Sequence, residues 1–204
     1  MKRQFISILI CLSFSKALAL TCYDCYNDCS NPNQTTPCSD KCATYSDIIY
    51  EDDVVSRNRA RICSKECYST SLNVGFSKIA ANIKCCDSDL CNNEPISDVD
   101  VRPNGKQCHF CAGENCLGIL YCEGIEDRCF TQIGTTDGRE IIYKGCVSES
   151  ICLLVTKGLH FTNINPDTNV TMKCCEGNLC NSAESVTLSF ILMLPFLLST
   201  LLFH

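Results

Sequence analysis

Groups that act as acids or bases near neutral pH are scarce in this sequence. There is no tryptophan and there are only three histidines, of which His109 and His160 lie away from the chain ends. No recognisable motif places a serine or cysteine nucleophile beside either of them. The acidic residues at 51–53 and 126–127 lie in turn-like surroundings, where a solvated loop is the simplest interpretation. We therefore expect no enzymatic activity, no catalytic residues and no cofactor.

Basic residues are too few for a nucleic-acid-binding protein, because 17 lysines and arginines against 23 acidic residues give a formal charge of −6. Three arginines, Arg57, Arg59 and Arg61, alternate along one expected strand, so their side chains project from the same face. They form either a patch for an acidic partner, a sulfated glycan or lipid headgroups, or a solvated face offset by the acidic residues 51–53. The sequence leaves both interpretations open.

The apolar segment near the N-terminus is too short to span a bilayer. Lys2 and Arg3 precede an apolar run at 5–14, and Ala17-Leu18-Ala19 has the small-x-small pattern of a cleavage site. These features predict a signal peptide at 1–19 and place the protein in the secretory pathway. Removal of this peptide takes away Cys11 and leaves 20 of the 21 cysteines.

The apolar segment at the other end, 188–203, lacks the basic flank that usually follows a membrane-spanning helix. It comes after small residues and a short polar spacer, which is the pattern of a glycosylphosphatidylinositol (GPI) attachment signal. We expect segment 182–204 to be removed and the lipid to be attached at Asn181, with Ser182 as the second choice. A single-pass protein held by the inserted tail is the alternative.

Cysteine is abundant, at a level typical of disulfide scaffolds in secreted proteins. The stretch CCDSDLCN at 85–92 returns as CCEGNLCN at 174–181. Adjacent cysteines cannot easily bond each other, so each such closing motif must fasten a chain end to a distant segment. We interpret the repeat as two units, 20–92 and 108–181, with ten cysteines in each. The segment 93–107 has two prolines and no cysteine, which predicts a linker.

Strands are the expected secondary structure of both units, and no stretch has a convincing helical period. Residues 43–50 and 54–62 form one predicted hairpin, and residues 128–133 and 140–144 form another around an Asp-Gly turn. Short strands are also expected at 81–84 and 170–173, directly before the closing motifs. Each unit is so small that disulfides, rather than an apolar core, should decide its stability.

The Cys-x-x-Cys pairs at 22–25 and 108–111, with His109 nearby, raise the question of zinc binding or redox chemistry. Exported cysteines oxidise to disulfides, and their number is even once the signal peptide is removed. No helix N-terminus is recognisable that would lower the pKa of a thiol. We therefore expect neither a metal site nor a redox site. Spacing alone does not resolve the pairing, since ten cysteines allow on the order of a thousand combinations.

The opening Leu20-x-Cys22-x-x-Cys25, the ten cysteines per unit and the closing Cys-Cys-x4-Cys-Asn resemble the lymphocyte-antigen/urokinase-receptor (LU) family. The resemblance covers 20–181 and implies an all-β, small, disulfide-rich fold with two tandem three-finger domains like those of snake toxins. It also implies that Asn92 and Asn181 fasten the last loop of each unit to its base. The spacing between the second and third cysteines is short in both units. This sequence has two units, whereas the urokinase receptor has three. We therefore do not assume a urokinase-binding cavity.

The family pattern implies five disulfides in each unit. In the first unit they are Cys22–Cys42, Cys25–Cys29, Cys38–Cys63, Cys67–Cys85 and Cys86–Cys91. In the second unit they are Cys108–Cys129, Cys111–Cys116, Cys122–Cys146, Cys152–Cys174 and Cys175–Cys180. This pattern leaves no cysteine of the two units unpaired.

Contacts with a partner are expected at apolar runs near the finger ends, 48–50, 119–121 and 159–161. Aromatic and aliphatic anchors carry most of the energy of protein interfaces, so Tyr50 and Phe161 join the three arginines as candidate contact residues. Half-buried strand packing explains these runs equally well. Asn33-Gln-Thr and Asn169-Val-Thr are N-glycosylation sequons in loop-like surroundings, and we expect a glycan on at least one of them.

The resemblance implies a GPI-anchored protein on the extracellular face of the plasma membrane. Such a protein binds an extracellular or membrane protein as a receptor, adhesion or modulatory module. The alternative is a secreted binding protein like the gamma-type phospholipase inhibitors, which are also two-unit members of the family. The segments Lys144-Gly-Cys-Val and Cys152-Leu-Leu resemble those inhibitors. The apolar C-terminal segment favours the anchored form, because a soluble inhibitor has no use for it.

Overall fold

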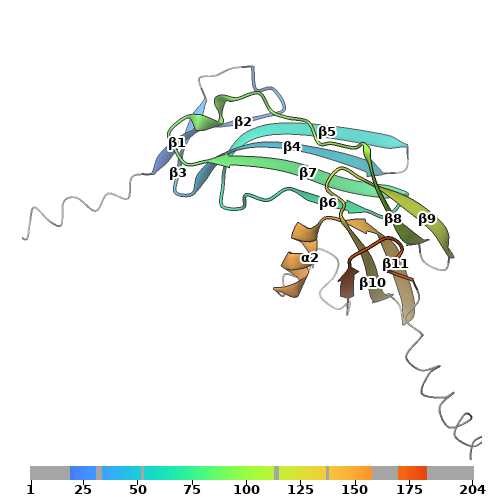
Figure 1. Ribbon diagram of the computed structural model, residues 1–204. Coiled ribbons are helices and arrows are strands. Elements are labelled where there is room, and N and C mark those ends of the chain that lie inside the picture. The colour runs from blue at the N-terminus through green and yellow to red at the C-terminus, as the bar shows by residue number, and fades with distance from the viewer. Residues whose placement is uncertain are drawn as a thin grey trace, which may run out of the picture.

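Strands dominate the computed structural model, which describes residues 19–30, 34–51, 53–112, 115–136, 138–157 and 170–182. The expected all-β, disulfide-rich fold is confirmed, and its strands follow the two cysteine repeats, the first and second units (Figure 1). The first unit contains β1 (Leu20–Tyr23), β2 (Cys25–Tyr26), β3 (Thr35–Cys38), β4 (Lys41–Glu51), β5 (Val54–Ser64), β6 (Thr70–Asn73), β7 (Ser77–Cys86) and the short helix η1 (Cys91–Asn93). The second unit contains β8 (Pro103–Ala112), β9 (Asn115–Glu123), β10 (Arg128–Thr136), β11 (Arg139–Val147), α2 (Glu149–Thr156) and β12 (Thr171–Cys175).

Both expected hairpins are present, since β4 pairs with β5 along its whole length and β10 does so with β11. The turn of the second hairpin contains Gly138 at φ 73°, a left-handed conformation that glycine adopts without steric cost. The short strands expected before the closing motifs are present as the end of β7 and as β12. β8 begins at Pro103, so residues 103–107 of the segment expected to be a linker belong to a strand.

Helix α2 contradicts the expectation that no stretch is helical. It has only eight residues, several of them β-branched, so it is too short to show a clear helical period. Ile151 and Cys152 are buried in a cluster with Phe130, and this contact fixes the helix on the sheet. The hydroxyl of Ser148, at the N-cap position, makes no capping bond. It accepts instead the backbone N–H of Ser71 in the first unit at 3.0 Å.

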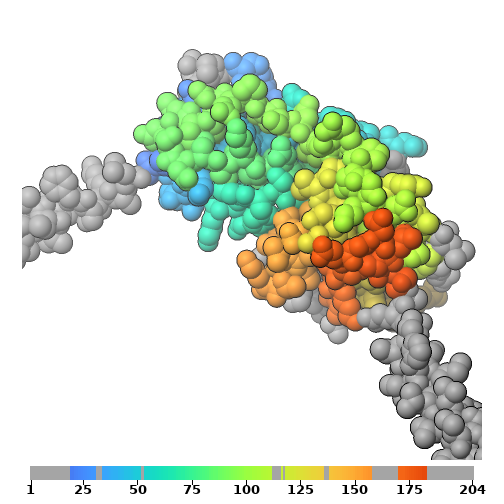
Figure 2. All heavy atoms as spheres, viewed as in Figure 1, coloured from blue at the N-terminus to red at the C-terminus, as the bar shows by residue number. Residues whose placement is uncertain are grey.

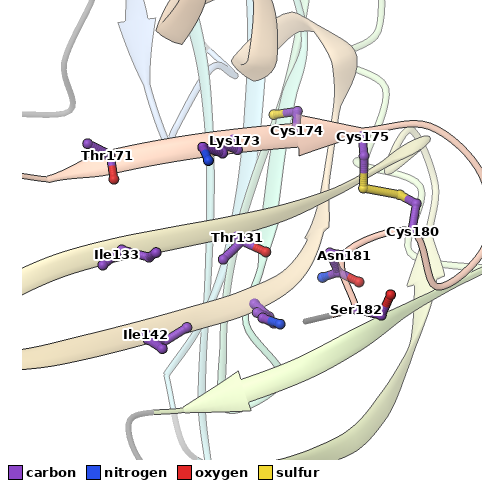
Figure 3. Close-up of a pocket in the computed structure, with 11 residues that line it drawn as sticks. Thr131, Ile133, Ile142, Thr171, Lys173, Cys174, Cys175, Cys180, Asn181 and Ser182 are labelled. Carbon is purple, nitrogen blue, oxygen red and sulfur yellow. A yellow bond between two sulfur atoms is a disulfide. The ribbon is translucent and has the colours of Figure 1, made fainter. Parts of the chain in front are cut away.

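Ten disulfides hold the two units, five in each, and they join the same cysteine pairs that the resemblance implies. The buried centre of the first unit is formed by Cys22, Cys38 and Cys42, and a corresponding cluster in the second is formed by Cys108, Cys122, Cys129 and Cys146. Each unit is therefore centred on sulfur rather than on a large aliphatic core. Figure 3 shows the disulfide Cys175–Cys180 in the closing motif of the second unit, which begins at the end of β12.

Asn92 and Asn181 each tie a closing motif to the start of its unit. The amide of Asn92 accepts the N–H of Tyr23 at 3.0 Å and donates to the carbonyls of Tyr23 and Ala43 at 3.0 and 3.1 Å. Asn181 makes three equivalent bonds with the backbone of His109 and of strand β10. Both side chains are buried, so each satisfies three backbone groups away from water.

The two units share one β-sheet. β6 pairs antiparallel with β11 through Leu72 opposite Val147 and Asn73 opposite Cys146. The main path of the resulting sheet has the order β12-β10-β11-β6-β7-β4-β5-β2, and off this path β8 pairs with β11 and with β9. Figure 2 shows the second unit packed directly against the first. Gly145 permits this approach, because a Cβ atom there would lie 2.0 Å from the carbonyl oxygen of Asn73. Backbone hydrogen bonds therefore join the units in addition to the covalent connection.

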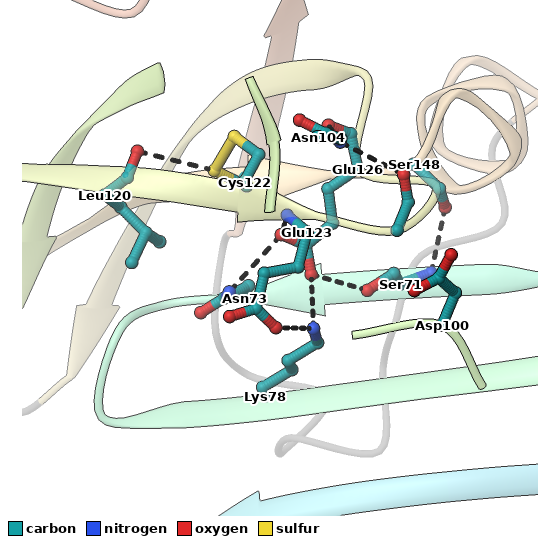
Figure 4. Close-up of polar contacts among 12 residues, drawn as sticks. Ser71, Asn73, Lys78, Asp100, Asn104, Leu120, Cys122, Glu123, Glu126 and Ser148 are labelled. Carbon is teal, nitrogen blue, oxygen red and sulfur yellow. Dashed lines mark hydrogen bonds and ion pairs between the residues drawn. A yellow bond between two sulfur atoms is a disulfide. The ribbon is translucent and has the colours of Figure 1, made fainter. Parts of the chain in front are cut away.

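A buried ionic network lies beside this shared edge (Figure 4). Glu126 contradicts the expectation of a solvated turn, because its side chain is 0% exposed. Its carboxylate accepts the hydroxyl of Ser71 at 2.8 Å and the amide of Asn73 at 3.3 Å. The buried Nζ of Lys78 lies 3.3 Å from Glu126 and 2.6 Å from Glu123. A carboxylate that has lost its hydration needs such partners, and here they come from the opposite unit.

Replacing Asn92 with alanine leaves three backbone groups unpaired inside the first unit. Each buried group without a partner costs about 1–3 kcal/mol, and we expect Asn92→Ala to lower the free energy of unfolding by roughly 2–4 kcal/mol. Asn93→Ala, at the exposed next position, is the matched control and should change it by less than about 0.5 kcal/mol. Denaturant titration of the unreduced protein, followed by circular dichroism, measures both. Equal midpoints for the two variants would show that Asn92 has no such role.

Lys78→Ala should be more damaging, because it leaves the Glu126 carboxylate buried without its counter-ion. Removing one partner of a buried ion pair costs about 3–5 kcal/mol. Lys84→Ala, on the same strand, is the control: the side chains of Lys84 and its partner Glu94 are 69% and 58% exposed, and such pairs contribute at most about 1 kcal/mol. The measurements are the thermal midpoint and the hydrogen-exchange protection of the β6 and β11 amides. A similar loss in both variants contradicts the role assigned to the network.

Candidate partner-binding surface

Tyr50 lies near the end of the long β4–β5 finger, opposite Val55 on β5 and Lys78 on β7. Its side chain is half-buried, as is that of Ile49, whereas Ile48 is fully buried. Ile48 and Tyr50 project from the same face of β4, so burial on this face decreases towards the end of the finger. Ile48 packs inside the first unit, and Tyr50 remains a candidate contact residue.

Three exposed apolar side chains near the finger ends of the first unit were not selected from the sequence. Val54 and Val55 begin β5 and are 68% and 50% exposed, and Phe76, in the turn between β6 and β7, is 46% exposed. Clustered apolar side chains of this kind are typical of surfaces that another molecule covers.

The β8–β9 hairpin adds two exposed side chains from the second unit. Ile119 and Tyr121 are 52% and 61% exposed, whereas Leu120 between them packs against the cysteine centre. The hairpin reaches the first unit through Phe110, whose ring leaves no room for a Cβ atom at Gly75 in the β6–β7 turn. The free end of the β4–β5 hairpin and the β8–β9 hairpin lie at the same end of the molecule (Figure 1). We call the apolar residues there the finger-end surface: Tyr50, Val54, Val55, Phe76, Ile119 and Tyr121.

Two of the three arginines expected to contact a partner are engaged within the chain. Arg59 pairs with Asp98 at 2.5 Å, and the guanidinium of Arg61 donates to the carbonyl of Asn93 at 3.2 Å. Asp98 and Asn93 belong to the segment between the units, so these two arginines hold that segment against the first unit. Arg57 lies nearer the finger end, is exposed and remains a candidate contact.

The two large pKa shifts among the described residues come from local pairs. Burial, together with the Asp47 carboxylate that accepts the Tyr45 hydroxyl at 2.6 Å, raises the pKa of Tyr45. Hydrogen bonds from Arg102 hold the pKa of Asp100 well below its usual range. Each pair joins residues two positions apart in the chain. Both shifts therefore reflect local strand and turn geometry.

The sulfur atoms of Cys108, Cys122 and Cys146 lie within 4.8 Å of one another, a spacing at which thiolates bind metal ions. Cys108 is bonded to Cys129, and Cys122 is bonded to Cys146. None of the three can offer the thiolate that zinc requires while these disulfides are intact. The cluster is therefore a structural centre of the second unit.

Several expected sites lie outside the described residues: the sequons at Asn33 and Asn169, the candidate contact Phe161, the signal segment up to residue 18 and the C-terminal segment from residue 183. Asn181 and Ser182 are described, the first buried and the second exposed at the end of the closing motif. Within the described ranges, no helix has the length and hydropathy needed to cross a bilayer.

The residues of the finger-end surface that sequence reasoning missed do have a sequence signal. Val54 and Val55 are adjacent β-branched residues directly after the acidic residues 51–53, at the start of an expected strand. Phe76 follows Gly75, whose φ of 80° marks a tight turn. An apolar residue next to a turn in a small disulfide-rich unit is therefore a contact candidate.

Two family models match the chain, one in each half. Residues 18–94 match the u-PAR/Ly-6 domain, and residues 104–186 match the activin types I and II receptor domain. The two matches correspond to the two cysteine repeats and to the two groups of strands. The likeness to known domains therefore extends over both units.

The chain is also similar to a surface receptor and to phospholipase inhibitors. It is 33% identical over 111 residues to the urokinase plasminogen activator surface receptor of Mus musculus, which covers 49% of the chain and 33% of the receptor. It is 28% identical over 191 residues to phospholipase A2 inhibitor NAI of Notechis ater, which covers 82% of the chain and 94% of the inhibitor. It is 30% identical over 150 residues to a gamma-type phospholipase A2 inhibitor of Elaphe climacophora, which covers 66% of the chain and 74% of the inhibitor.

The chain thus spans 33% of the length of the mouse receptor, but 94% and 74% of the lengths of the two inhibitors. The repeated closing motifs, the sulfur-centred units and these alignments lead to one conclusion. The chain belongs to the u-PAR/Ly-6 family of disulfide-rich three-finger proteins.

Proposed function

We propose that this chain is a two-domain cell-surface protein that binds another extracellular protein through its finger-end surface. The exposed apolar side chains at the finger ends carry the proposal, with Ile119 and Tyr121 more than half exposed, at 52% and 61%. Tyrosine and large apolar side chains are frequent anchors of protein interfaces. The relatives are named as a surface receptor and as inhibitors, and the chain is a binding protein rather than an enzyme. It acts as a receptor, adhesion or modulatory module.

The shared sheet supports this proposal because it presents the two units as one body. Pairing of β6 with β11 and the buried contact between Lys78 and Glu126 hold the finger ends of the two units relative to each other. Binding to a preorganised surface loses less conformational entropy than binding to two loosely linked modules. A partner that contacts Val55 and Tyr121 therefore gains from both units at once.

Attachment to the extracellular face of the plasma membrane through a GPI lipid is part of the proposal. The apolar segment 188–203, which follows small residues and a short polar spacer, supports it. Asn181 is the proposed attachment residue, with Ser182 second. Attachment uses the main-chain carboxyl group, so the side chain of Asn181 keeps its bonds to His109. N-linked glycans at Asn33 and Asn169 complete the proposed surface form.

A secreted inhibitor of a phospholipase A2 is the second candidate function. It is favoured by the length of the match to phospholipase A2 inhibitor NAI, which extends over 94% of that protein, against 33% for the mouse receptor. The partner in this case is an extracellular phospholipase A2, and the finger-end surface is again the contact. The two candidates differ in where the protein resides.

Treatment of intact cells with phosphatidylinositol-specific phospholipase C separates these candidates. Cells express the full chain, and the protein is measured on the cells and in the medium. We expect it on the cells before treatment and in the medium afterwards, because the enzyme cleaves the lipid of a GPI anchor. Leu194→Arg combined with Leu197→Arg, which interrupts the apolar segment, should abolish surface display.

Two other outcomes contradict the anchored form. Protein that stays on the treated cells indicates an inserted tail. Protein already in the medium before treatment, at the same level with and without the two arginines, supports the secreted inhibitor.

A charge placed on the finger-end surface should abolish partner binding. Ile119→Asp introduces a carboxylate whose burial against a partner costs more than the roughly 1.4 kcal/mol that corresponds to a tenfold loss of affinity. Leu153→Asp is the matched control, because Leu153 on α2 is also 52% exposed but lies outside this surface. Full chains fused to a peroxidase are displayed on living cells, and their biotinylated neighbours are compared. We expect the neighbours of the unmodified protein to persist with Leu153→Asp and to disappear with Ile119→Asp. The reverse result places the contact surface elsewhere.

A further inference from the structure

A cleft with a volume of about 440 Å³ lies on the second unit, formed by β10, β11, β12 and the closing motif (Figure 3). Its volume is within the range of pockets that bind small molecules. Asn181 and Ser182 line one end of it, and no residue of the finger-end surface contributes to it. The cleft is therefore a separate candidate site, which the proposed partner binding does not use.

The strand register arranges the side chains of the cleft in rows across the three strands. In the row next to the closing motif Cys175 lines the cleft. The next row is Lys173, Thr131 and Lys144, and the third is Thr171, Ile133 and Ile142. Residues opposite each other in antiparallel strands project from the same face of the sheet. The cleft thus places a row with two cations directly beside a row with two isoleucines.

The two lysines are spaced to hold one acidic group. Lys173 and Lys144 flank Thr131 on either side. Adjacent strands are about 4.8 Å apart, so the Cα atoms of the lysines lie roughly 10 Å from each other. Both ammonium groups can then approach one phosphate or carboxylate above Thr131, whose hydroxyl offers a further donor.

Charged residues at the two ends of the cleft determine which end the acidic group of a ligand would occupy. No described lining residue is acidic. Glu140, opposite Thr135, lies beyond the isoleucine row, on the side away from the closing motif. The positive charges of the lysine row attract an acidic group, and the carboxylate of Glu140 repels it from the far end, which favours an uncharged chain there.

We propose that this cleft binds a single-chain lipid with an acidic headgroup. The phosphate or carboxylate lies between Lys144 and Lys173, and the acyl chain lies over Ile133 and Ile142. A free ion leaves the isoleucine row uncovered, and a neutral lipid gains no charge attraction from the lysine row, so neither matches both rows. The site depends neither on partner binding nor on a GPI anchor.

Photolabelling with defined lipids tests this proposal on the full chain. Cells that express the protein are given, in the cold, lysophosphatidic acid whose acyl chain carries a diazirine and an alkyne. Parallel samples receive the same chain as a free fatty acid or as zwitterionic lysophosphatidylcholine. After irradiation the chain is isolated from the cells or from the medium, whichever holds it, and the adducts are located by mass spectrometry.

We expect adducts from the acidic probes on the peptides that contain Ile133 and Ile142. The zwitterionic probe should give about tenfold fewer, because its choline group opposes the lysine pair. A stronger signal from lysophosphatidic acid identifies a phosphate lipid as the occupant, and a stronger signal from the fatty acid identifies a carboxylate. Adducts on the C-terminal segment are scored separately, since that segment is apolar by itself.

Charge reversal of the two lysines provides the second measurement. Lys144→Glu with Lys173→Glu should reduce labelling of the cleft peptides by about tenfold. Lys65→Glu with Lys157→Glu, two exposed positions outside the cleft, is the matched control and should leave labelling unchanged. The proposal is overturned if wild-type protein carries no adduct on β10 or β11, if the zwitterionic probe labels equally, or if the Lys144/Lys173 variant labels undiminished. Should that variant fail to leave the cell, the wild-type adduct positions and the probe comparison decide.

Discussion

The disulfides are the constraint on which the rest of the structure depends. The buried centre of each unit consists largely of cysteine, and covalent bonds at the base of the fingers replace the aliphatic core of a larger domain. The sheet faces are therefore not all needed to enclose a core. Val54 and Tyr121 remain exposed without loss of the fold, and a cleft persists between strands of the second unit. A small protein therefore has room for both of the proposed binding surfaces.

The contact between the units adds a second constraint. β6 and β11 satisfy each other's backbone groups, so neither presents an open edge at this position that would recruit a foreign strand. The buried carboxylate of Glu126 finds most of its partners in the other unit, where Ser71, Asn73 and Lys78 approach it. Breaking the contact exposes unpaired backbone and leaves the Glu126 side chain without these partners. The two units therefore behave as one folded body.

The elements of the fold were predictable because their signals are local. Strand alternation, the Asp-Gly turn and the closing motifs lie within short stretches, and the family resemblance supplied the cysteine pairing. Helix α2 was not predictable, since eight residues with several β-branched side chains show no clear period. The burial of Glu126 was not predictable either, because its partner Ser71 is 55 positions away. A turn-like sequence around Glu126 says nothing about what packs over the turn.

The candidate binding surface was predictable only in part, for the same reason. The run 119–121 pointed to Ile119 and Tyr121, and strand alternation explains why Leu120 faces inward instead. Arg59 and Arg61 were indistinguishable from Arg57 in the sequence. Their roles differ because the segment between the units passes over them, and the course of that segment is decided by contacts between the units.

The close approach of Gly145 to Asn73 also bears on how such a chain evolves. A recombination event that replaced either half would have to bring an edge strand of matching register. It would also need a residue without a Cβ atom at position 145 and a hydroxyl at position 148 to receive the N–H of Ser71. Duplication of a gene segment supplies two similar modules. Here the edge strand and the contact residues of each module must also fit those of the other. A substitution at this contact is therefore tolerated only when both halves accommodate it.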